Sequence, residues 1–190
     1  MSTRRSSKAE RRTSSLRSTP IQQGPALPPL EAGVHFAEKD TRKGKRLPTH
    51  IPFAEELRSD LPVLLGQGLA RLHCSAGDAP EAIVAAVHRL VSDLQDGKTT
   101  LSKGELAEVA IAWGEQLVRA LGWQWAAVVY DDGSKPIGVI SPDRSLAHFP
   151  QAFLESLAVK TQENTVELLF AMLRAGKKPS SKPWRYLPVA

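Results

Sequence analysis

The sequence predicts an α+β fold in which helices pack on a small antiparallel sheet. Three observations predict it. Apolar residues over 102–121 follow the 3.6-residue period of an amphipathic helix. This helix runs directly into a β-hairpin expected over 123–141. A short apolar run near 146–149 is expected to add a third strand, because a two-stranded hairpin alone is only marginally stable in water.

A basic arm, residues 1–50, precedes the expected domain. It carries eleven Lys or Arg and four Asp or Glu, a net +7, whereas residues 51–190 carry fourteen and sixteen, a net −2. Ser, Thr and Pro are abundant in the arm, so it has too little apolar surface to offset the chain entropy lost on folding. We therefore expect a disordered arm, one domain over 51–176, and a Pro-, Lys- and Ser-rich tail over 177–190.

Three helices are expected before residue 100. The first is a short one over 52–60, and the second covers 61–72, where two glycines interrupt the apolar pattern. The third begins at Asp78, which has the side chain of an N-cap, with Glu81 as its capping-box partner. Its apolar face is broad, and a glycine follows its end, as at many helix C-termini.

The central helix has clear signals at both ends. Ser102 and Glu105 have the spacing of a capping box, and Gly122 stands where a left-handed glycine ends many helices. Trp113 falls on the apolar stripe, so we assign it to the core. Gly114, beside it, offers a point where another element can approach closely.

The hairpin and the C-terminal helices follow from turn and cap signals. Trp123 and Trp125 share one strand face, and residues 131–134 have the composition of a turn. Two further helices are expected, over 151–159 and 164–175, the second with Asn164 as the N-cap.

The residues that could carry out chemistry do not form a recognisable site. Gly97-Lys98-Thr99 lacks the earlier glycine and the preceding strand of a P-loop, and Cys74 has no evident base or electropositive pocket. The histidines do not have metal-ligand spacing. We therefore expect no catalytic residues, no cofactor and no metal. With no long apolar run and no export signal, a cytoplasmic protein is expected.

Two surfaces remain as candidates for binding. A protein partner could contact charged and aromatic side chains at the helix, the hairpin turn and the tail. These residues are Glu115, Arg119, Asp131, Asp132, Trp184 and Tyr186. Glu115 and Arg119 are also expected to form an i,i+4 ion pair.

The alternative partner is a nucleic acid bound without sequence preference through the arm. Its phosphates would meet two clusters of cations. These are Arg4, Arg5, Arg11 and Arg12, and Arg42, Lys43, Lys45 and Arg46. No aromatic side chain alternates with these cations, so base stacking is not indicated. A purely solubilising role is also open for this arm.

The central stretch resembles a group of small bacterial domains of unknown function. In those domains a helix with Gly-Glu, here Gly114-Glu115, runs into Leu-Gly-x-x-Trp, here 121–125, and then into a hairpin with an acidic turn. The resemblance covers residues 101–175. It implies an α+β unit without an active site, and some such domains resemble immunity proteins that neutralise the toxins of rival bacteria. A non-enzymatic protein-binding module is therefore the expected function.

Overall fold

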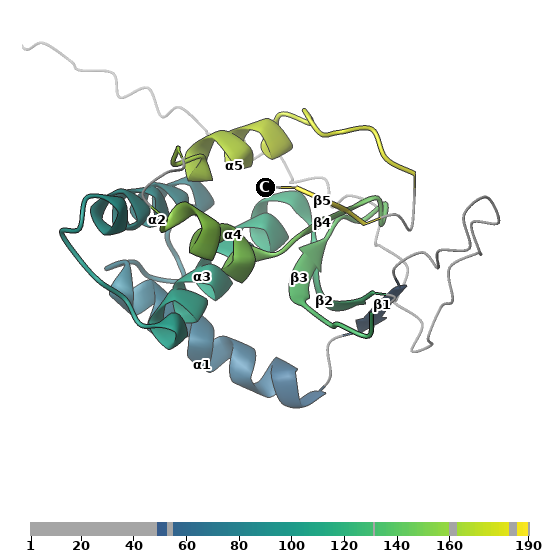
Figure 1. Ribbon diagram of the computed structural model, residues 1–190, viewed down its shortest axis with the longest axis horizontal. Coiled ribbons are helices and arrows are strands. Elements are labelled where there is room, and N and C mark those ends of the chain that lie inside the picture. Colours follow the sequence, from purple (N-terminus) through teal and green to yellow (C-terminus); the bar gives the residue numbers. More distant parts are fainter. Residues whose placement is uncertain (1–48, 53–54, 131, 160–162, 183–185, 190) are drawn as a thin grey trace, which may run out of the picture. The chain divides into compact units, whose positions relative to one another are not determined.

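Helices and a mixed sheet make up the described part of the computed structural model (Figure 1). The structure describes residues 49–52, 55–130, 132–159, 163–182 and 186–189, all within one compact unit. The helices are α1 (Glu55–Arg71), α2 (Pro80–Gln95), α3 (Lys103–Leu121), α4 (Pro150–Leu157) and α5 (Val166–Arg174). The strands are β1 (Thr49–Pro52), β2 (Gln124–Val129), β3 (Ile137–Ile140), β4 (Leu146–His148) and β5 (Leu187–Pro188).

The sheet has the order β1-β2-β3-β4-β5. The first four strands are antiparallel, with Trp125 opposite Val139 in the hairpin, and β5 joins β4 in parallel. The α+β class is confirmed, and so are the hairpin and the third strand. Two edge strands were not expected. β1 includes Pro52, where a short helix was predicted, and β5 comes from the tail.

Helix α3 is the centre of the fold, and it packs against α1, α2, α4, α5 and β3 (Figure 1). Its predicted ends are confirmed. The Ser102 side chain accepts from the Glu105 N–H, the Glu105 carboxylate accepts from the Ser102 N–H, and Gly122 is left-handed with φ 66°. Trp113 is fully buried, as its place on the stripe predicted.

Glycines let other elements pack closely on α3. A Cβ at Gly114 would lie 2.5 Å from the Trp125 ring and 2.8 Å from the Pro150 ring, which confirms the expected close approach. A Cβ at Gly68 would lie 2.1 Å from the carbonyl oxygen of Glu108. The structure has one continuous helix, α1, where two short helices were predicted before residue 72, so that prediction is wrong. Helix α1 continues through its glycines because packing against α3 outweighs their low helix propensity.

The predicted cap at Asp78 is wrong, and the one at Asn164 forms only in part. Asp78 accepts hydrogen bonds from the backbone and hydroxyl of Ser75, while Ala79 is the N-cap of α2. The Asn164 amide nitrogen donates to the His88 carbonyl and the Ser92 hydroxyl on α2, while its Oδ1 accepts from the Val166 N–H at 3.4 Å. The N-cap position itself is Thr165, so α5 begins at Val166, one residue later than predicted. Asn164 thus fixes the start of α5 against α2.

The two faces of the sheet contribute to separate apolar clusters. Trp123, Val139 and Leu146 face the helices and belong to the main core. The opposite face forms a smaller cluster of Ala126, Val128, Ile140, Ala147 and Tyr186. The alternation predicted for the first hairpin strand is confirmed, since its tryptophans and the Ala126–Val128 pair belong to different clusters.

Candidate interaction surface

The buried polar groups at the centre serve the fold. The Trp113 Nε1–H donates to His148 Nε2 at 2.7 Å, and His148 Nδ1 lies 2.7 Å from the carbonyl oxygen of Val189. A carbonyl only accepts, so Nδ1 carries the proton and the ring is neutral. Burial lowers the pKa of His148 to about 4, against the opposing effect of the Val189 hydrogen bond. This histidine is fully enclosed, which makes it a structural group and not a general base.

The ion pair predicted between Glu115 and Arg119 on α3 does not form. The Glu115 carboxylate accepts from the Trp125 Nε1–H at 3.0 Å. The Arg119 guanidinium donates to the Gln116 side chain and to the Asp78 carbonyl oxygen. Each side chain therefore joins α3 to a neighbouring element, β2 for the first and the start of α2 for the second.

The other predicted contact residues lie apart in the fold. Asp132 lies in the β2–β3 turn, where hydrogen bonds from the side chain and the N–H of Ser134 hold its pKa below the usual value. Tyr186 is fully buried and its hydroxyl bonds to Nδ1 of His50, while burial raises the pKa of the phenol. Asp131 and Trp184 lie outside the described residues, and so do all eight predicted phosphate contacts.

Two potentially reactive groups among the described residues, Cys74 and Asp143, have shifted pKa values. Burial, followed by the charge of Asp78, raises the pKa of the Cys74 thiol, which keeps it protonated. In the β3–β4 turn, partial burial of Asp143 is outweighed by hydrogen bonds from Lys178, Ser141 and Ser145, which hold the pKa of its carboxyl well below the usual value. Across the described residues, no cluster of three or more His, Cys, Asp and Glu could hold a metal ion.

Helix α5 presents a second apolar face to solvent. Its buried stripe is Val166, Leu169, Phe170 and Leu173. The outward face carries Leu168, Ala171, Met172 and Ala175, which we call the α5 surface. Leu168 is 58% exposed and Met172 is 42% exposed, and the four positions have the i, i+3, i+4, i+7 spacing of one helix face. A helix that is apolar on both sides is typical of one covered on both sides.

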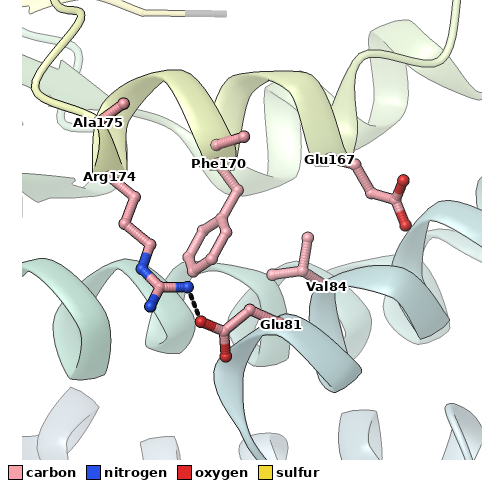
Figure 2. A pocket seen from close by; sticks show the side chains of 7 residues that line it. Glu81, Val84, Glu167, Phe170, Arg174 and Ala175 are labelled. Carbon is pink, nitrogen blue, oxygen red and sulfur yellow. Dashed lines mark ion pairs between the residues drawn. The ribbon is translucent and has the colours of Figure 1, made fainter.

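Two hollows border the α5 surface. The α2–α5 hollow has a volume of about 440 Å³ and reaches Ala171 and Ala175 at the edge of the surface. Figure 2 shows Arg174 reaching from α5 to an ion pair with Glu81 on α2, with Phe170 between this pair and Glu167. The carboxylates and the guanidinium are not accompanied by a nucleophile in the lining of this hollow.

The second hollow separates α5 from the C-terminal segment and has a volume of about 270 Å³. We call it the C-terminal groove. Leu168 and Met172 line one wall, and Pro179, Pro188 and Val189 line the other. Together the two hollows leave the α5 surface as an apolar ridge between depressions.

The charge around α5 changes sign along its length. Glu163 precedes the helix and Glu167 lies in its first turn. Arg174 is the last residue of the helix, and Lys177, Lys178 and Lys182 follow it. Lys177 lines the C-terminal groove, and within the part of the chain that the structure describes neither it nor Glu163 forms an ion pair.

The sequence contained the signal for the α5 surface. Val166, Leu169, Phe170 and Leu173 have the spacing of a core stripe, and Leu168 and Met172 also have helical spacing on the opposite side. A helix with apolar residues on both sides, as over 166–175, is a recognisable sign of an interaction face.

Comparison with known proteins gives no relative for this chain: no family model, no curated protein and no solved structure matches it. Among the helices that the structure describes, none combines the length and apolar character needed to cross a bilayer.

Proposed function

We propose that this chain is a non-enzymatic protein-binding module that contacts its partner through the α5 surface. The observation that carries the proposal is the pair Leu168 and Met172, two large apolar side chains exposed on one helix face between two hollows. Covering each would contribute on the order of 1 kcal/mol to binding. Apolar anchors with this spacing are typical of helix-in-groove recognition.

The finer part of the proposal follows from the resemblance of residues 101–175 to small bacterial domains. It makes this protein a cytoplasmic, immunity-like module of a bacterium that neutralises a toxin by direct contact. The fully buried His148 supports a binding role over a catalytic one, because it is not available to a substrate. The raised pKa of the Cys74 thiol supports the same role, because a protonated thiol is a poor nucleophile.

The test is photo-cross-linking in the native host, with a photoreactive phenylalanine analogue in place of Leu168. A defined adduct should form at residue 168. The matched control places the same analogue at Val63 on α1, which is 61% exposed and therefore similarly accessible. Equal adducts at both positions, or none at residue 168, would contradict the proposal.

A second candidate function is non-specific nucleic-acid binding by the arm, favoured by the net charge of +7 within residues 1–50. Binding of a duplex should then weaken steeply as salt rises, because each phosphate contact releases counterions. A chain that contains only 51–190 should lose this binding. If it binds the duplex as tightly as the full chain at the same salt, the arm is not the binding element.

A further inference from the structure

We propose that the α5 surface is occupied by a second copy of this chain, packed α5 against α5 in antiparallel fashion about a two-fold axis. The inference rests on the protein-binding role proposed above and names the partner. A two-fold contact requires one surface to be complementary to itself in charge and in shape.

Charge complementarity comes from the two ends of α5. Glu163 and Glu167 lie at its beginning, and Lys177 lies after its end. Arg174 and Lys178, at the same end, already pair with Glu81 and Asp143 within the chain, so Lys177 is the cation at this end that the contact uses. An antiparallel copy places the acidic end of one helix against the basic end of the other. A parallel copy would place like charges together, which disfavours it.

The apolar residues give the register of the contact. If Leu168 of one copy lies opposite Met172 of the other, residue 170 is at the centre of the crossing. Positions equally far from that centre then face each other across the axis. Glu163 lies three residues before α5 and Lys177 lies three residues after it, so an antiparallel pair brings the Glu163 of each copy near the Lys177 of the other, and this pairing occurs twice. Neither side chain has an ion pair among the described residues that would compete.

The shape is also complementary to itself. The α5 surface is a ridge, with the α2–α5 hollow on its alanine side and the C-terminal groove on its Leu168 side. Small side chains at Ala171 and Ala175 permit a second helix to approach closely. The ridge of each copy can therefore lie in a hollow of the other.

The size of the surface sets the expected strength. A helix of nine residues is only about 14 Å long. It supplies less than the roughly 800 Å² per partner of a standard interface. We therefore expect a reversible dimer with a dissociation constant on the order of micromolar to hundreds of micromolar.

The test is sedimentation velocity of the full chain over a wide concentration range. The wild type should shift from monomer to dimer as concentration rises, and Leu168→Lys should abolish the shift, whereas Val63→Lys should leave it unchanged. Glu163→Lys and Lys177→Glu should each weaken the dimer about tenfold, because two attractive rim pairs become repulsive. The double variant Glu163→Lys/Lys177→Glu should restore it, since it exchanges the two charges.

Three outcomes would overturn the inference: a monomer at every concentration, a dimer that Leu168→Lys leaves intact, or a double variant as weak as the single ones. A thermal melt of each variant checks that it is folded. A wild-type monomer whose residue 168 still cross-links to another protein would refute the two-fold dimer and leave the proposed function standing. Absence of both a dimer and a cross-link would refute the two together.

Discussion

At the residue scale, Trp113 and His148 join three elements that are distant in sequence. The indole on α3 donates to the imidazole on β4, and the imidazole in turn binds the Val189 carbonyl after β5. The indole also stacks on Phe153 of α4 and meets Phe170 of α5 edge to face. Each polar atom of the two rings is thereby satisfied inside an apolar core, where an unpaired one would cost about 1–3 kcal/mol.

Trp113→Ala should lower the free energy of unfolding by about 3–5 kcal/mol, because it leaves a large cavity and removes the donor to His148. Urea unfolding followed by circular dichroism measures the loss. Arg89→Ala, an exposed position on α2, is the control and should change stability little. An unfolding curve of Trp113→Ala that matches the wild type would show that this ring is not the centre of the core.

Stability should fall as pH decreases from about 6.5 to about 4 through the protonation of His148. The folded state holds this ring neutral, with its pKa lowered to about 4, whereas the unfolded chain takes up a proton near the ordinary value of 6.5. Below pH 6.5 the unfolded state therefore binds more protons, and about 3 kcal/mol is lost by pH 4. Urea midpoints across this range check the slope.

The acid response of Asp143 should be separate from that of His148. Its folded-state pKa is lowered, so its stabilising contribution is complete above an unfolded value of 3.8 and is lost only below it. A flat stability profile between pH 6.5 and 4 would thus contradict the neutral buried histidine directly.

At the element scale, local signals predicted helix ends well where the capping side chain had no other partner. The Ser102–Glu105 box and the left-handed Gly122 formed as their spacing predicted. Asp78 has equally good capping chemistry but accepts from Ser75 instead, and Asn164 divides its hydrogen bonds between α2 and the Val166 N–H. Such competition depends on which element lies nearby in space, so spacing along the chain does not reveal it.

Two glycines of α1 should respond to alanine in opposite ways. Gly68→Ala should destabilise the fold, because its Cβ would lie 2.1 Å from the Glu108 carbonyl and would push α1 away from α3. Gly66→Ala meets no atom within 4 Å and should stabilise the fold by about 0.5–1 kcal/mol through helix propensity. Melting temperatures of the two variants test this pair; a change in the same direction for both would refute the close α1–α3 contact.

At the scale of the whole molecule, a buried hydrogen bond links the two edges of the sheet. His50 on β1 and Tyr186 before β5 are both buried and bond to each other across 136 positions of sequence. Composition placed the domain boundary at residue 51 because charge and apolar content change there. A tertiary contact between two residues, such as His50 and Tyr186, leaves no trace in the composition of the chain. Neither edge strand could therefore be predicted from composition.

A chain that begins at residue 51 should melt several degrees below one that begins at residue 45. The shorter chain lacks His50 and half of β1, and it leaves the Tyr186 hydroxyl without this partner. Losing a buried partner costs about 1–3 kcal/mol, which corresponds to roughly 3–10 °C for a domain of this size. Differential scanning calorimetry compares the two chains, and equal melting temperatures would show that β1 contributes nothing to stability.

The candidate surface was less predictable than the fold. Charged and aromatic residues were expected to mark it, yet Glu115, Arg119 and Tyr186 are engaged in contacts within the chain. The surface that emerges is apolar, and it became visible only when the structure showed which side of α5 faces the core. When a helix has apolar residues on both sides, only its orientation in the fold shows which side is buried and which is exposed.

The most direct test of the α5 surface measures stability and binding together in the full chain, comparing Leu168→Lys with Val63→Lys. Both substitutions place a cation at an exposed apolar position, at 58% and 61% exposure. If α5 is a binding surface, Leu168→Lys keeps the wild-type melting temperature and loses its cross-linked or dimeric complex, while Val63→Lys keeps both. A lower melting temperature with the complex retained in Leu168→Lys would contradict the central claim.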